Sequence, residues 1–196
     1  MAEETDLARM ARIGDSVFAV VVTLLAYRVR IPTLEALTGG QLAPLKPFVT
    51  DLAAVVMSFV VASMFWIGHW RVFRRMQHSD YGFVALNLAF LGTLILLPIS
   101  TSVMSIAGDS PMGALAYSAN LFLLATAETF FRRHARRLDP QVFGSARLLL
   151  SMSLMMLLFG GAAVVSLVWP AVCPALWSLA ILVPLVENRW GLGRTV

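Results

Sequence analysis

The stretch RMARIGDSVFAVVVTLLAYRVRIP, residues 9–32, decides the fold of this chain. From Ile13 to Tyr27 it carries one formal charge, Asp15, and arginines stand at both of its ends. An ionisable group just inside a membrane-length apolar run is costly to place in lipid, so it marks a candidate functional site. The stretch predicts a membrane helix, with further helices built around it.

The composition indicates a membrane protein. The chain has 196 residues, of which 59% are hydrophobic and 13% charged, whereas about a quarter of the residues of a soluble domain are charged. Its net charge of +4 does not indicate a nucleic-acid partner, because the arginines sit at the ends of apolar runs. The acidic N-terminus predicts that there is no cleavable signal peptide. The single cysteine, Cys173, excludes an intramolecular disulfide.

The apolar segments predict an all-α membrane protein with six transmembrane helices in one domain, residues 1–196. A helix needs about 20 residues to cross a bilayer. The expected helices cover residues 12–31, 50–72, 82–106, 112–131, 145–169 and 171–188. The loop at 32–49 contains glycines and prolines and is expected to hold one short helical turn at Leu34–Leu37.

The basic residues predict the orientation of these helices. Twelve of the 15 lysines and arginines lie before the first expected helix, between the second and third, between the fourth and fifth, or after the sixth. The other three are Arg28, Arg30 and Lys46. Since cytoplasmic loops are rich in Lys and Arg, both termini are expected to be cytoplasmic.

One face of the first helix carries a stripe of small polar and apolar side chains. At 100° per residue, Ser16, Val20, Thr23 and Tyr27 fall on one side together with Leu24, while Asp15 points elsewhere. Such a stripe is also what ordinary helix packing produces, because Ser and Thr let helices approach closely. The periodicity alone does not decide between a functional face and ordinary helix packing.

Polar residues on the other helices predict contacts between helices. His69 and Asp15 are expected at a similar depth, where a contact would be either a proton-sensitive latch or a static clamp. Asn87, Tyr117 and Asn120 are expected to hydrogen-bond between helices. Pro98 should kink the third helix and leave a carbonyl for another donor. Glu128 and Arg132 are expected to form a solvated i, i+4 pair.

Signatures of enzymes are absent from the sequence. There is no G-x-S-x-G, H-E-x-x-H, Walker or dinucleotide-binding motif. The three histidines lie in separate segments without metal-ligand spacing, and there is no TVGYG-type filter. We therefore expect neither an enzyme nor a resident metal or cofactor.

Two motifs resemble the transmembrane protein 175 family of lysosomal potassium channels and their bacterial homologues. The family pattern R-x-x-x-F-S-D reads Arg9-Met-Ala-Arg-Ile13-Gly14-Asp15 here, with Ile13 and Gly14 in place of Phe and Ser. A W-x-x-H ending follows on the second helix as Trp66-Ile-Gly-His69. The third helix adds Asn87-Leu88 and Leu97-Pro98.

The resemblance implies a homotetrameric potassium channel in the bacterial inner membrane, with the first helix of each subunit lining the pore. Carried onto this chain, the apolar constriction is Val20, Leu24 and Tyr27, and potassium is the permeant ion that passes near Thr23. A network that couples the helices would consist of the following residues: Arg9, Asp15 and His69. Gly14 lacks the hydroxyl that the family's Ser would add to that network.

Other functions remain open at this point. A weakly selective cation channel or a proton-permeable channel fits the same helices. A secondary transporter would need broken helices, for which Pro98 and Pro184 are candidates, and polar groups at mid-membrane, where we expect no carboxylate. A non-conducting membrane scaffold is the remaining alternative.

Overall fold

The computed structural model describes residues 2–38, 45–107, 110–140 and 146–180, and within them the chain is all α-helical, as predicted. Its long helices are α1 (Ala2–Tyr27), α3 (Lys46–Phe73), α6 (Pro111–Leu138) and α7 (Ala146–Val165). The shorter elements are α2 (Leu34–Thr38), α4 (Tyr81–Ile95), α5 (Leu97–Ala107), the 3-10 turn η2 (Pro170–Val172) and α8 (Cys173–Leu179). The expected helical turn after the first helix is thus present as α2.

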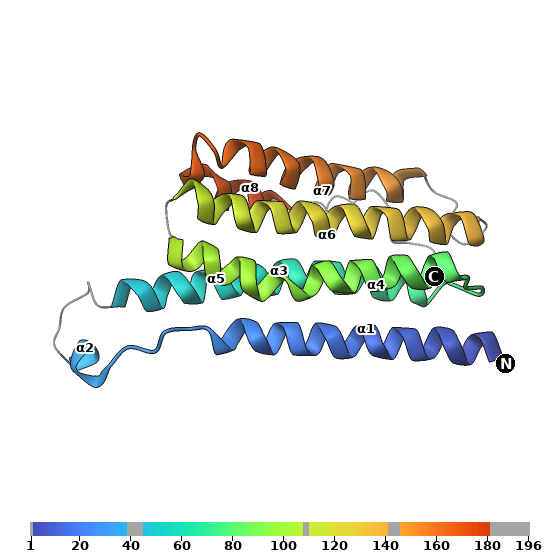
Figure 1. Ribbon diagram of the computed structural model, residues 1–196, viewed down its shortest axis with the longest axis horizontal. Helices are drawn as coiled ribbons and strands as arrows, with labels where there is room; N and C mark the ends of the chain where they lie inside the picture. Colours follow the sequence, from blue (N-terminus) through green and yellow to red (C-terminus); the bar gives the residue numbers. More distant parts are fainter. Residues whose placement is uncertain (1, 39–44, 108–109, 141–145, 181–196) are drawn as a thin grey trace.

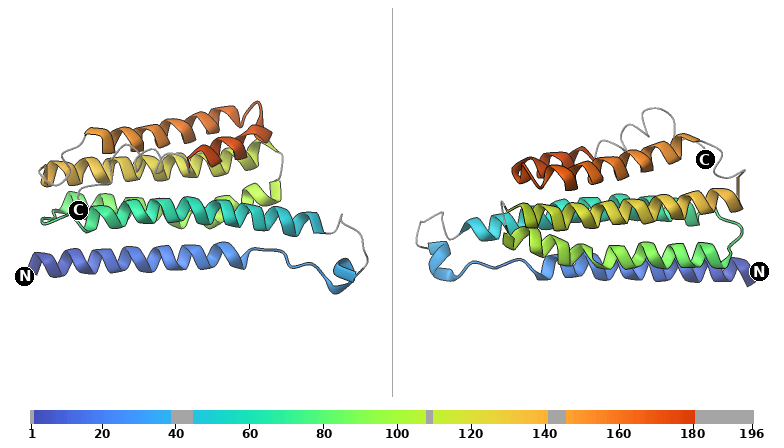
Figure 2. Two further views of the ribbon diagram at one scale, coloured as in Figure 1. Left: turned by 180° about the vertical axis from the view of Figure 1, so that it is seen from behind. Right: turned by 45° about the horizontal axis from the view of Figure 1, so that its top comes forward.

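The helices run side by side in an elongated bundle (Figure 1). Helix α1 forms one outer layer, α3 and the α4–α5 pair form the next, and α6 separates these from α7 and α8 (Figure 2). The start of α1, the α3–α4 connection and the end of α6 lie at the same end of the bundle (Figure 1). Three of the predicted basic clusters are therefore on one side of the molecule.

Four helices are long and apolar enough to cross a membrane, namely Asp6–Tyr27, Lys46–Phe73, Tyr81–Ala107 and Pro111–Leu138. They match the first four expected segments, although α1 and α6 are both longer at their polar ends. The fifth expected segment, 145–169, corresponds to α7. The sixth, 171–188, contains η2 and α8 and then continues beyond the described residues.

Helix α1 ends at Tyr27 and not at residue 31 as expected. Pro32 disfavours helical backbone at the residue before it. Farther back, the Arg30 backbone N–H donates to a carboxylate oxygen of Asp51 on α3, 2.9 Å away. Because that N–H is bonded to Asp51, the segment after Tyr27 leaves the helix and is fastened to α3.

The third membrane helix is interrupted at Leu96, where α4 ends and α5 begins. Pro98 has no N–H to donate within the helix, so a break just before it is expected. The amide of Asn120 on α6 donates to the Thr93 carbonyl at this break, over 3.0 Å. The predicted kink is confirmed, but the donor from α6 reaches the Thr93 carbonyl, whereas the carbonyl that Pro98 frees is that of Leu94.

Buried hydrogen bonds join α6 to its neighbours. Tyr117 pairs with Ser58 of α3 over 3.0 Å, and Ser100 of α5 donates to Asn120 over 2.9 Å. The Ser110 hydroxyl caps the start of α6 by accepting from the Gly113 N–H. Since lipid offers no competing partners, such bonds fix which faces of the helices meet.

The Glu128–Arg132 pair was expected to be solvated, and that expectation is wrong. The pair is fully enclosed, with side-chain exposures of 0% and 4% and a 2.7 Å contact. Helix α6 continues to Leu138, which places Glu128 well inside the bundle. Gly68 of α3 makes room, because a Cβ there would overlap the Arg132 guanidinium. A carboxylate that was expected to be solvated is thus enclosed by the bundle.

The end of the bundle that holds the N-terminus is fastened by two histidine–carboxylate contacts. His134 of α6 meets the Asp80 carboxylate at 2.8 Å, and His78 meets Asp139 at 3.2 Å. Asp80 also caps α4, and the Phe83 backbone N–H together with the His134 ring holds the pKa of this carboxyl below its ordinary value. These contacts fix the α3–α4 connection to α6.

The buried Glu128–Arg132 pair leads to a prediction about stability. Arg132→Met leaves the Glu128 carboxylate buried without its counter-charge and should cost about 3–5 kcal/mol, whereas the double variant with Glu128→Leu should recover most of that loss. Arg133→Met, at an exposed neighbouring position, is the matched control. Thermal unfolding in detergent measures all three. Equal melting temperatures for the Arg132 and Arg133 variants would contradict the buried location.

Candidate functional site

The first membrane helix has one buried face and one open face. Gly14, Phe18, Val21 and Leu25 are buried against the rest of the chain. The opposite side exposes Val20 by 58%, Leu24 by 45% and Tyr27 by 84%, with Thr23 and Ser16 also exposed. Only 22% of the apolar stretch of α1 is buried, against 56% for α6. The predicted stripe therefore lies outside the core of the protomer.

The two hydroxyls on the open face have their protons engaged within the helix. Thr23 Oγ1 donates to the Ala19 carbonyl over 2.8 Å, and Ser16 Oγ donates to the Arg12 carbonyl over 2.9 Å. A hydroxyl oxygen keeps two lone pairs as acceptors when its proton is engaged. Both side chains consequently present oxygen acceptors on the open side.

His69 of α3 is the main contact on the buried side of α1. Its ring, 1% exposed, lies so close to Gly14 that a Cβ there would be 2.6 Å from the ring carbon Cε1. Rings of α1, α3, α4 and α6 surround it: Phe18, Phe73, Phe90 and Phe131. Where the family motif has a Ser hydroxyl, this chain has a close contact between the Gly14 backbone and the His69 ring. In the sequence, the only sign of this contact was the glycine in place of the family's serine.

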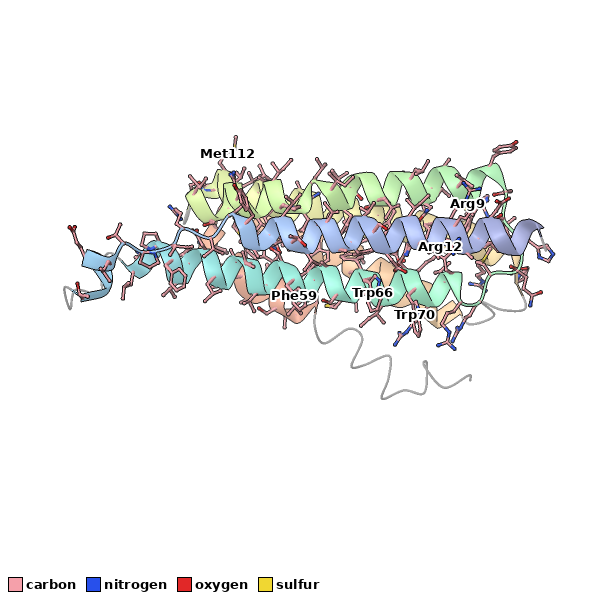
Figure 3. All side chains as sticks on the ribbon, turned by 90° about the horizontal axis from the view of Figure 1, so that it is seen from below. Arg9, Arg12, Phe59, Trp66, Trp70 and Met112 are labelled. Atoms are coloured by element: carbon pink, nitrogen blue, oxygen red, sulfur yellow. The ribbon has the colours of Figure 1, made fainter. Side chains whose placement is uncertain are left out.

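Arg9, Asp15 and His69, which were expected to form a coupling network, do not bond to one another. Asp15 accepts a hydrogen bond from the Trp66 indole N–H over 2.9 Å, and His69 pairs with the Asn87 amide oxygen over 2.8 Å. Figure 3 shows Trp66 on α3 alongside α1. The separation arises because Asp15 faces outward while the helix presents Gly14 to His69. Arg9 makes no hydrogen bond or ion pair within the described residues.

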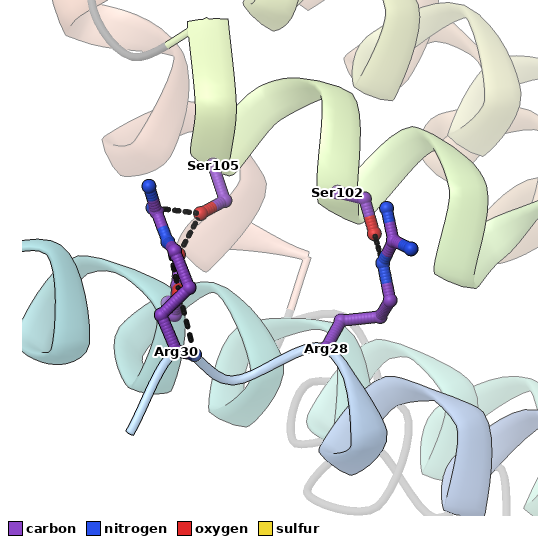
Figure 4. Close-up of polar contacts among 5 residues, drawn as sticks. Arg28, Arg30, Ser102 and Ser105 are labelled. Atoms are coloured by element: carbon purple, nitrogen blue, oxygen red, sulfur yellow. Dashed lines mark hydrogen bonds and ion pairs between the residues drawn. The ribbon is translucent and has the colours of Figure 1, made fainter. Parts of the chain in front are cut away.

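At its other end, α1 is held through Arg30 and Asp51. The guanidinium binds both carboxylate oxygens, with Nε 2.7 Å from Oδ2 and Nη2 2.6 Å from Oδ1 (Figure 4). Ser105 of α5 also donates to this carboxylate, and the contact with Asp51 raises the pKa of Arg30. Asp51 was not singled out from the sequence, although it stands at the start of an apolar run as Asp15 does.

A groove runs along the open face between α1 and α4. Its volume is about 630 Å³, and Ile95 forms its α4 wall. Its lining on α1 includes Arg12, Ser16, Val20 and Leu24. The open face is therefore concave, with basic residues at one end and apolar residues along its length. Among the described residues no cluster of His, Cys, Asp and Glu could hold a metal ion.

The fold and this site define a helical, multi-pass membrane protein. The family model described as "Endosomal/lysosomal potassium channel TMEM175" matches residues 9–98. The chain is 28% identical over 142 residues to a potassium channel of Chamaesiphon minutus, covering 70% of each chain. It is 24% identical over 138 residues to a mouse protein named endosomal/lysosomal proton channel TMEM175, covering 68% of this chain and 28% of that one.

The fold agrees with these sequence matches. A crystal structure of a lysosomal potassium-selective channel TMEM175 homologue from Chamaesiphon minutus superimposes with a TM-score of 0.82 at 21% identity, over 94% of this chain and 99% of that one. The resemblance is confirmed: the chain is similar to TMEM175 channels in sequence and in fold.

The contact between Gly14 and His69 predicts an asymmetry between two glycines. Gly14→Ala places a methyl group against a ring that four aromatic side chains hold in place, so it should destabilise the protein by about 1–3 kcal/mol. Gly92→Ala on α4 meets open space and should be neutral or slightly stabilising. Melting temperatures in one detergent provide the comparison. A Gly14 variant as stable as the Gly92 variant would contradict this packing.

Proposed function

We propose that this chain forms a potassium channel of the bacterial inner membrane, selective or weakly selective among cations, in which copies of α1 line the pore. The observation that carries the proposal is the open face of α1, where hydroxyl acceptors and apolar side chains share one stripe. The names of the related potassium channels support the same function. Potassium passes close to Thr23, and the proposal needs no resident cofactor.

The proposed mechanism follows from the order of side chains along α1. Rings of Val20 and Leu24, with Tyr27 beyond them, form an apolar constriction that stops ions when it is dry. Thr23 lies between Val20 and Leu24, and its oxygen replaces part of the hydration of an ion when the constriction is wet. Because the hydroxyl proton is bonded to Ala19, the oxygen can face the ion.

The proposal includes an assembly and a topology. One copy of α1 cannot enclose a pore, so the channel needs several copies. The resemblance to the TMEM175 family implies a homotetramer, in which the open faces meet around a common axis. We also infer six crossings, with α7 and the segment that begins at α8 as the fifth and sixth, and cytoplasmic termini. The basic clusters at one end of the bundle support that orientation.

The constriction makes the first functional prediction. Val20→Asn puts an amide into the apolar ring and should raise potassium leak severalfold, because the constriction then stays wet. Val20→Ile keeps the ring apolar and should not raise it. Flux into proteoliposomes measures both variants, and an unchanged or lower flux for Val20→Asn would argue against a gate at this position.

Thr23 makes the second functional prediction. Thr23→Ala removes the oxygen acceptor and should weaken the preference for potassium over sodium, while Thr23→Ser, which keeps it, should retain most of that preference. Reversal potentials in asymmetric potassium and sodium solutions measure the change. Identical values for the wild type and Thr23→Ala would remove Thr23 from the selectivity mechanism.

A proton-permeable channel is the second candidate, because one related protein carries the name proton channel. The titratable groups near α1 do not favour it, since His69 is buried away from the open face and Asp15 is bonded to Trp66. Proton flux under a pH gradient without potassium distinguishes the two candidates.

The same flux measurements address the other two alternatives. A flux that saturates with ion concentration would favour a transporter, and the absence of any flux would favour a scaffold.

A further inference from the structure

The end of the bundle that holds α2 carries two arginines with different surroundings. Arg30 is neutralised by the two-point contact with Asp51. Arg28, just after the end of α1, donates through Nε to the Ser102 hydroxyl of α5 over 3.0 Å. The two terminal nitrogens of Arg28 make no hydrogen bond within the described residues, and Figure 4 shows them pointing away from Arg30. A positive charge with open donors is therefore left at this end.

A hydrogen bond to Ser102 orients the Arg28 guanidinium. Ser102 accepts from Arg28 and donates its own proton to the Pro98 carbonyl over 2.8 Å. A planar guanidinium with two free amino groups matches the oxygens of a phosphate with two parallel hydrogen bonds. Since this hydrogen bond orients the guanidinium beforehand, less conformational entropy is lost when an anion binds.

Two adjoining cavities, of about 370 Å³ and 350 Å³, meet at Arg28. The smaller one has apolar walls from α1 and α5: Leu24, Pro98, Ile99, Val103 and Ile106. The larger one is lined by Arg28, Arg30, Asp51 and four hydroxyl-bearing residues, together with apolar side chains. A space that holds charged and polar groups thus continues directly into an apolar groove along the helices.

The depth of this site fits the boundary of a bilayer. Tyr27 is the last residue of Asp6–Tyr27, the stretch of α1 that is long and apolar enough to cross a membrane. The guanidinium one residue farther on then lies at the level of lipid headgroups, and the groove beside Ile99 points toward the hydrocarbon. The charged part of the site is thus at the depth of a lipid headgroup, and its apolar part is at the depth of the acyl chains.

We propose that Arg28 and the α1–α5 groove bind one anionic phospholipid, with its phosphate on the Arg28 guanidinium and an acyl chain along Ile99 and Val103. Charge complementarity argues for this occupant, because a second apolar helix would leave the guanidinium without a partner. Leu24 and Tyr27 border the groove, so the lipid lies beside the open face of α1. The site does not depend on ion conduction.

Native mass spectrometry of the detergent-purified protein with phosphatidylglycerol tests the proposal. Arg28→Gln removes the charge and should lower lipid retention at least tenfold, because at least one of the two charge-assisted hydrogen bonds to the phosphate is lost. Lys46→Gln, which removes a charge from the exposed start of α3, is the matched control and should retain the lipid. Ile99→Trp, at an exposed position in the groove, should also lower retention and tests the apolar half independently.

Four results would overturn the proposal. The first is equal retention by wild type and Arg28→Gln, and the second is an equal loss in Lys46→Gln. The third is retention of zwitterionic phosphatidylcholine as strong as that of phosphatidylglycerol. The fourth is cross-linking of Ile99→Cys between copies in a Cys173→Ala background, which would place a second chain in the groove. Because lipid retention is read without ion flux, a failure here is distinguishable from a failure of the channel proposal.

Discussion

The close approach of His69 to Gly14 is the contact on which the arrangement of this protein depends. An imidazole enclosed by four phenylalanine rings cannot move aside easily, because packed interiors leave no room for it. Gly14 can lie against it only while α1 keeps one rotation about its own axis. That rotation places Phe18, Val21 and Leu25 inside and leaves Val20, Thr23 and Leu24 open.

Further contacts extend this constraint along α1 and across the bundle. Arg30 and Asp51 fasten the segment after α1 to α3, and Asp15 and Trp66 fasten its first half. Next to His69 on α3, Gly68 receives the buried Glu128–Arg132 pair of α6. The contact of Gly14 with His69 joins α1 to α3, and the contact of Gly68 with Arg132 joins α3 to α6. Because His69 and Gly68 are neighbours, both contacts lie at the same depth in the bundle. A movement of α1 as a rigid body would have to break these polar contacts, one at Asp15 in the middle of the helix and one at Arg30 just after its end.

The sequence predicted the parts of this structure that depend on local pattern. The all-helical class, the first four membrane segments and the kink at Pro98 follow from hydropathy or proline geometry. Periodicity predicted which residues of α1 form a stripe, but not that this stripe is open. Contacts between helices were predicted less well. Asp15 and His69 were correctly placed at a similar depth, but depth does not say which neighbour each side chain meets, and both found other partners in Trp66 and Asn87.

The burial of Glu128 and Arg132 shows the same limit. An i, i+4 pair near a run of arginines is typical of a solvated helix end, and the space that encloses it comes from Gly68, which is 60 residues away in sequence. Likewise, Gly14 was noted as a lost hydroxyl, whereas its role is to admit a ring from another helix. Such roles depend on which faces meet, and a single sequence does not specify these.

Cysteine cross-linking of the protein in its native membrane tests the central claim most directly, namely that copies of α1 turn their open faces toward one another. In a Cys173→Ala background, Val20→Cys should form cross-links between chains under mild oxidation. Phe130→Cys, at a similarly exposed apolar position on α6, should not. Efficient cross-linking at Phe130 with none at Val20 would show that the open face of α1 meets lipid, which would contradict a pore built from this helix.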